Sequence, residues 1–153
     1  MPFWCKSDIL ELWVRSGTMS VITTEITVKN GADVIDAMRG RIKEDEVRQM
    51  TVQSIVDTGA WTMVINEETR DKLGLLDRGF GEANLADGKE EVVPMAGPVE
   101  VWWKNRRFTG DALVLPDAKD ILLGAIPLEE MDLTINPKRE LVGVHGDRVL
   151  HRV

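Results

Sequence analysis

Apolar and polar positions follow one another in short runs along this chain, and turn-forming residues separate the runs. Short runs rich in Val, Ile and Leu, bounded by Gly, Pro, Asn or Asp, are typical of β-strands. The segments predicted as strands are residues 21–29, 50–56, 61–65, 97–103, 108–115, 121–123, 133–135 and 140–144. The pattern therefore predicts a protein built mainly of strands.

Helical spacing is confined to a few short segments. Apolar residues share one face of a predicted helix over residues 33–38, and Gly40 is expected to end it. Residues 43–48 are rich in charge and predict a single helical turn in a solvated connection. Asn66 can cap a second helix, and Gly74 can end it. A third short helix is expected after residue 124.

Residues 80–94 predict a β-hairpin. Its arms are residues 82–86 and 89–93, and Asp87-Gly88 is a favoured two-residue turn between twisted strands. A second hairpin is predicted around Asn105. The pattern over residues 80–94 fits an ordinary surface hairpin as well as a functional one.

Two tryptophans and a basic cluster lie around that second turn. Trp102 and Trp103 are consecutive in a predicted strand, so their side chains should lie on opposite faces. Core packing is expected for either, with an interface or a pocket wall as the alternative for one of them. Arg106 and Arg107, with Lys104, are interpreted as a solvated loop rather than a phosphate site.

The length of 153 residues predicts one domain. Scarce aromatic residues and abundant Val, Ile and Leu suit a β-rich core. Residues 19–153 are assigned to this domain. Residues 1–18 are interpreted as an N-terminal extension, either a frayed tail or an arm that packs on a partner subunit.

The sequence contains no motif typical of metal or cofactor chemistry. The single cysteine, Cys5, excludes an internal disulfide and a multi-cysteine zinc site. His145 and His151 have neither the spacing of a metal site nor a Gly-x-Ser-x-Gly turn to serve. No glycine-rich nucleotide loop occurs. We therefore expect no metal and no cofactor.

Charge and hydropathy restrict the partners and the compartment. The net charge of -7 argues against a nucleic-acid backbone or an anionic membrane as partner. No apolar run approaches the roughly 18 residues of a membrane span. Lys6, Asp8 and Glu11 interrupt what would be the apolar core of a signal peptide. A reducing, cytoplasmic setting is the expectation.

The stretch over residues 54–65 carries the candidate chemistry. An apolar run leads to Asp57, the chain turns on Thr58-Gly59, and a second apolar run follows. Gly59 is expected to adopt backbone angles that other residues avoid, and to let another backbone come close. Asp57 would then be a carboxylate held on a rigid turn between two strands, as a catalytic group requires.

This stretch resembles the active-site loop of the retroviral-type aspartic proteases, the retropepsins. The family has apolar-apolar-Asp-Thr-Gly-Ala, which matches residues 55–60, and later apolar-apolar-Gly before a short helix, which matches residues 121–131. The resemblance covers roughly residues 22–142. It implies an all-β protein, a closed barrel of the acid-protease fold with one or two short helices, that forms a homodimer.

The resemblance also implies an activity, that of an aspartic endopeptidase acting on a peptide or protein. A water molecule would be activated between two Asp57 carboxylates, one from each subunit. Thr58, Gly59, Ala60 and Gly124 would support the loop: Thr58 by a hydrogen bond to the partner's loop, Ala60 and Gly124 by being small. The alternative is a catalytically silent dimerisation or peptide-binding module of the same fold.

By the same resemblance the first hairpin is a flap that closes over substrate. Its tip, and the expected substrate-binding segment, comprises Leu85, Ala86, Asp87 and Gly88. Two features depart from the family. The tip carries charge where retroviral enzymes are rich in glycine, and extra residues at 30–50 and after 136 predict a different dimer contact.

Overall fold

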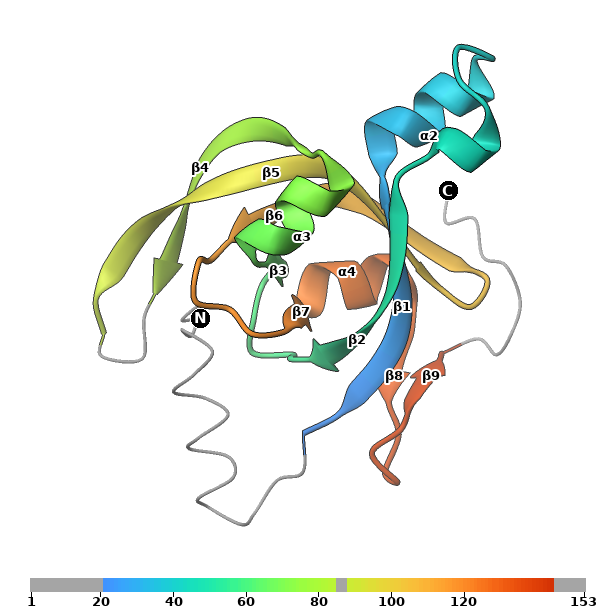
Figure 1. Ribbon diagram of the computed structural model, residues 1–153. Helices are drawn as coiled ribbons and strands as arrows, with labels where there is room; N and C mark the ends of the chain where they lie inside the picture. Colours follow the sequence, from blue (N-terminus) through green and yellow to red (C-terminus); the bar gives the residue numbers. More distant parts are fainter. Residues whose placement is uncertain (1–20, 85–87, 145–153) are drawn as a thin grey trace.

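The computed structural model describes residues 21–84 and 88–144 (Figure 1). The elements in chain order are β1 (Thr23–Asn30), α2 (Gly31–Met38), the 3-10 helix η1 (Glu44–Glu46), β2 (Gln49–Val56), β3 (Met63–Ile65), α3 (Glu67–Leu73), β4 (Leu76–Asn84), β5 (Glu90–Trp103), β6 (Arg106–Val114), β7 (Ile121–Leu123), α4 (Ala125–Glu130), β8 (Leu133–Ile135) and β9 (Leu141–Gly143). The expected extension, Cys5 and both histidines lie outside the described residues.

Six strands close into a barrel. The sheet order is β1-β2-β7-β3-β6-β5-β4, and β1 also pairs with β5, which joins the two ends of the first six. Strand β4 lies outside the ring and pairs with β5 alone. The prediction of an all-β protein with a closed barrel and short helices is confirmed, although the described part of the chain has three α-helices rather than one or two.

Strand β7 brings the two halves of the candidate loop region together. It pairs in parallel with β2, with Val56 opposite Leu123, and antiparallel with β3, with Val64 opposite Leu122. The residues that follow β2 and β7 are Asp57 and Gly124. The topology therefore places both residues at the same edge of the barrel.

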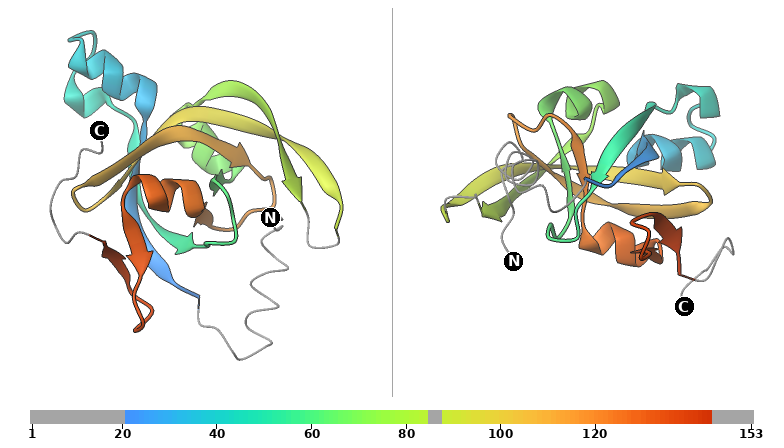
Figure 2. Two further views of the ribbon diagram at one scale, coloured as in Figure 1. Left: turned by 180° about the vertical axis from the view of Figure 1, so that it is seen from behind. Right: turned by 90° about the horizontal axis from the view of Figure 1, so that it is seen from below.

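Strands β4 and β5 each correct a sequence prediction. The segments expected over residues 89–93 and 97–103 are one continuous strand, and a register shift against β6 between Ala96 and Val99 absorbs the Gly-Pro pair inside it. Strand β4 begins at Leu76, earlier than expected. The hairpin of β4 and β5 projects from the barrel at the end opposite to α2 (Figure 2).

The predicted helix caps are confirmed. The Asn66 side chain accepts a hydrogen bond from the Thr69 amide, and Gly74 ends α3 in the left-handed conformation. Asn30 caps α2 in the same way and also donates to the carbonyls of Leu73 and Gly74. This one buried amide joins β1, α2 and the end of α3.

Two apolar clusters fill the molecule. The larger one lies inside the barrel and includes Val28, Val101 and Trp103. The smaller one includes Ala60 of the candidate loop together with Ala83 and Val93 of the hairpin. Trp103 is buried, whereas Trp102 is half-buried between the cations of Lys29 and Arg107, so the two tryptophans do face opposite sides.

The interpretation of Arg106 as part of a solvated loop is wrong. Arg106 begins β6 and is 5% exposed, and its guanidinium donates to the carbonyls of Met131 and Asp132. It also forms an ion pair of 3.3 Å with the Asp132 carboxylate. The arginine therefore fixes the turn between α4 and β8. Arg107, next in sequence, is exposed as expected.

Within residues 21–84 and 88–144, no helix has the length and apolar character needed to cross a bilayer.

Candidate active site

Asp57 is the first residue after β2, and three backbone contacts fix its position. Its amide donates to the carbonyl of Leu123 on the neighbouring strand at 3.0 Å, and its carbonyl accepts from the amide of Ala60 at 3.2 Å. Its side-chain Oδ1 accepts from the amide of Gly59 at 2.9 Å. The carboxylate is therefore held at a defined place by the turn that carries it.

Asp57 is 6% exposed, yet one of its carboxylate oxygens is not fully buried. Among the described residues, the hydrogen bond from Gly59 to Oδ1 is the one bond that this side chain makes. No buried side-chain oxygen or nitrogen in this part of the chain lacks a partner, so Oδ2 reaches solvent. A carboxyl group with one oxygen held and the other accessible is suited to accept or donate a proton.

Gly59 serves this arrangement for a reason other than the predicted one. Its φ does not lie in the left-handed region, so the turn does not depend on unusual backbone angles. A Cβ at this position would stand 3.1 Å from Oδ1 of Asp57. The expectation about backbone angles is therefore wrong, and the glycine instead leaves room for the carboxylate above its own amide.

Gly124 lies directly behind the loop. A Cβ there would stand 2.3 Å from the carbonyl oxygen of Thr62 and 2.7 Å from that of Ala60. The next two amides, of Ala125 and Ile126, donate to the carbonyls of Ala60 and Trp61 at 2.7 and 2.8 Å. The start of α4 thus holds the loop through backbone bonds that need a residue without a side chain at 124.

The remaining loop residues differ in exposure. Ala60 is buried in the smaller apolar cluster, so a small side chain fits there. Thr58 is exposed, and within the described part of the chain its hydroxyl makes no hydrogen bond. A free hydroxyl beside a fixed carboxylate can bond to a group outside the protomer.

Two exposed apolar side chains lie beside the loop, and the exposure of Trp61 is a feature that sequence reasoning missed. Trp61 and Ile126 are 49% and 46% exposed, and a backbone hydrogen bond joins the two residues. The signal available was the placement of Trp61 immediately after the Asp-Thr-Gly-Ala turn. Val64 and Val93 are buried in the smaller cluster.

The predicted tip of the hairpin is only partly described. Leu85, Ala86 and Asp87 lie outside the described residues. Gly88 is exposed with φ of +83°, which fits the predicted turn. The arms, through Ala83 and Val93, belong to the same apolar cluster as Ala60, so the part of the hairpin near its tip packs toward the candidate loop.

An acid with a shifted pKa, Asp33, lies outside the candidate loop. A hydrogen bond from the Arg48 guanidinium is the main cause that lowers the pKa of Asp33, in α2.

Within the described residues, no group of three or more His, Cys, Asp or Glu side chains could hold a metal ion.

No protein-family model matches this chain, and no curated protein matches it either. The resemblance to retropepsins therefore rests on the sequence of residues 55–60 and 121–131.

Proposed function

We propose that this chain is one subunit of a homodimeric aspartic endopeptidase of the retropepsin type. The observation that carries the proposal is the Asp57 carboxylate, which is held through Oδ1 by the Gly59 amide while Oδ2 keeps some contact with solvent. The glycine behind it, Gly124, packs against the loop as the second family motif requires.

The chemistry needs two carboxylates that share one proton. Two such groups at hydrogen-bond distance cannot both ionise, so one holds the proton while the other stays charged. The charged member removes a proton from water as the water attacks the peptide carbonyl. The protonated member polarises that carbonyl and then protonates the leaving nitrogen. No second Asp-Thr-Gly occurs in the chain, so the second carboxylate is assigned to Asp57 of the partner subunit.

The surface around Asp57 supports a two-fold contact. Thr58 presents its hydroxyl to solvent, and Trp61 with Ile126 adds exposed apolar area beside it. In a symmetric dimer the same patch meets its own copy. Thr58 would then donate to the loop of the other subunit, and the apolar pair would be removed from water.

The hairpin of β4 and β5 packs beside the candidate loop. Its residues Ala83 and Val93 belong to the same apolar cluster as Ala60. We assign it the role of a flap, which would bind an extended peptide through backbone groups and exclude water from the reaction.

The test is cleavage of a mixed peptide library between pH 4 and 7, by the wild type and by Asp57→Asn. Asp117→Asn is the matched control, since Asp117 lies on an exposed turn without Thr-Gly. We expect cleavage by the wild type and the control, and none by Asp57→Asn. Equal turnover by Asp57→Asn would refute the mechanism.

Sedimentation of the same samples separates the two functions considered. A dimer that cleaves no peptide would favour the catalytically silent module. A monomer at every concentration would leave Asp57 without its second carboxylate, and the proposal would be wrong.

A further inference from the structure

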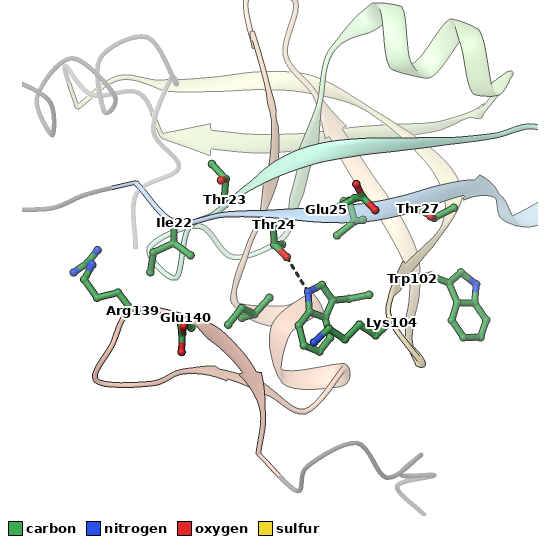
Figure 3. Close-up of a pocket in the computed structure, with 12 residues that line it drawn as sticks. Ile22, Thr23, Thr24, Glu25, Thr27, Trp102, Lys104, Arg139 and Glu140 are labelled. Carbon is green, nitrogen blue, oxygen red and sulfur yellow. Dashed lines mark hydrogen bonds between the residues drawn. The ribbon is translucent and has the colours of Figure 1, made fainter.

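A groove of about 630 Å³ lies along the first half of β1 (Figure 3). Residues 22–27, the start of β1 and the residue before it, form one wall. Residues 102–104, at the end of β5, and residues 139–141, at the turn into β9, form the others. The volume is within the range of sites that hold ligands of several hundred daltons. Asp57 and the part of β5 that pairs with β4 do not line this groove.

The backbone register leaves one edge of β1 open here. The amide of Val56 donates to the carbonyl of Ile22, so Ile22 and, two residues on, Thr24 direct their backbone groups to β2. Thr23 and Glu25 then direct their N–H and C=O groups to the opposite side. Strand β5 pairs with β1 only from Thr27 onward, so in the described structure these two residues have no strand partner.

The side chains divide into an inner and an outer row. Ile22 and Thr24 point into the groove, where the indole Nε1 of Trp103 donates to the Thr24 hydroxyl at 2.8 Å (Figure 3). Leu141 lines the same space from the start of β9. Small apolar side chains would therefore be buried on the inner side, at every second position of a bound strand.

Of the four charged side chains on the rim, Glu25 is the one that points to a basic ligand residue. Lys104 lies 4.6 Å from the ring of Trp103, and Glu140 is bonded to Asn136. Arg139 is also engaged in an interaction. Glu25, by contrast, is exposed and has no ionic partner among the described residues. It faces outward beside the open backbone groups, so a residue paired with it would present its side chain next to this carboxylate.

We propose that this groove binds an extended peptide segment of a partner protein, which adds a strand to the open edge of β1. The segment has small β-branched residues at alternate positions, directed into the groove, and a Lys or Arg opposite Glu25. Thr23 and Glu25 provide backbone donors and acceptors for it, as in other cases of strand addition to a sheet edge. This site does not depend on Asp57 or on proteolysis.

The probe is the blocked peptide acetyl-Thr-Val-Lys-Val-Thr-amide, titrated into the full chain labelled with ¹⁵N. We expect saturable shifts of the Trp103 indole signal and of the amides of Thr23 and Glu25. N-methylation of the lysine removes the donor that faces β1 and should weaken binding at least tenfold. N-methylation of the first valine is the matched control, because that N–H faces away, and should change the affinity less than threefold.

A pair of variants tests the protein side. Thr23→Pro deletes the N–H that faces the groove and leaves the bonds to β2 in place, and proline is tolerated at the first residue of a strand. Binding should fall at least tenfold in Thr23→Pro and less than twofold in Thr23→Ala. The indole shift also reports whether Trp103 keeps its bond to Thr24.

Three results would overturn the proposal: no saturable shift with the unmodified peptide, equal binding of the two N-methylated peptides, or slow hydrogen exchange of Thr23 and Glu25 before peptide is added. The last result would mean that other residues of the chain, or a second copy, already cover the edge. None of these outcomes depends on whether Asp57 is catalytic.

Discussion

Gly124→Ala tests how the candidate loop is supported. A methyl group at this position meets backbone atoms only: the carbonyl oxygens of Thr62 and Ala60 at 2.3 and 2.7 Å, and the amide nitrogen of Thr62 at 2.9 Å. Backbone cannot rotate away as a long side chain can. The loop and the start of α4 must therefore separate. Gly124 has φ of -89°, so the substitution adds no conformational strain of its own.

The expected cost follows from sterics and from two hydrogen bonds. Overfilling a packed site costs about 1–3 kcal/mol. Separation also lengthens the bonds from the amides of Ala125 and Ile126, now 2.7 and 2.8 Å, each of which contributes about 1 kcal/mol. The sum is about 3–5 kcal/mol, a large part of the roughly 5–15 kcal/mol that stabilises a typical domain.

The assay is urea unfolding at a fixed protomer concentration, with Gly40→Ala as the matched control. Gly40 has φ of +73° and no atom within 4 Å of an added Cβ, so its substitution costs only the left-handed strain, about 1–2 kcal/mol. With a slope of about 2 kcal/mol per molar urea, the midpoint should fall by roughly 2 M for Gly124→Ala and by less than 1 M for the control. Equal midpoints for the two variants would refute this account of the loop.

Three further predictions concern stability and assembly. Arg106→Met should cost about 3–5 kcal/mol in the same assay, because it leaves Asp132 buried without its cation, and adding Asp132→Asn should recover part of that loss; no recovery would argue against the pair. Arg48 lowers the pKa of Asp33, so the contribution of this pair is complete above pH of about 4 and is lost as the pH falls through the lowered pKa. The melting temperature of Asp33→Asn should therefore fall less between pH 5 and pH 2 than that of the wild type, and parallel curves would contradict this. Under the proposed function, Thr58→Ala should raise the dimer dissociation constant without lowering the melting temperature of the monomer; unchanged dissociation in a dilution series would count against the bond between subunits.

Local features of this fold could be predicted because neighbouring residues determine them. Asn66 caps the start of α3 with its side chain, and Gly74 ends the helix with its left-handed backbone angles. Asp57 follows a strand that alternates and then ends in the apolar pair Ile55-Val56, and Gly124 follows the apolar strand Ile121–Leu123. Each of these assignments needed no more than about ten residues of context.

Features set by distant residues could not be predicted. Residues 89–93 and 97–103 are predicted as two separate strands, but pairing with β4 and β6 continues through the residues between them, and β5 is one strand. Arg106 is buried because the turn after α4 packs over it, and nothing near it in sequence indicates that turn. The exposure of Trp61 and Ile126 likewise depends on where α4 lies.

The closure of the barrel has a consequence for the order of folding. Strands β4, β5 and β6 are linked by short connections and can pair soon after they meet. The contact of β1 with β5 comprises four residue pairs, from Thr27 with Trp102 to Asn30 with Val99, and joins segments from distant parts of the chain. Such a contact requires a long loop to close before it contributes any stability. We therefore expect the seam between β1 and β5 to form last, and the edge of β1 that faces β5 to stay open to mispairing until then, although β1 pairs with β2 on its other side.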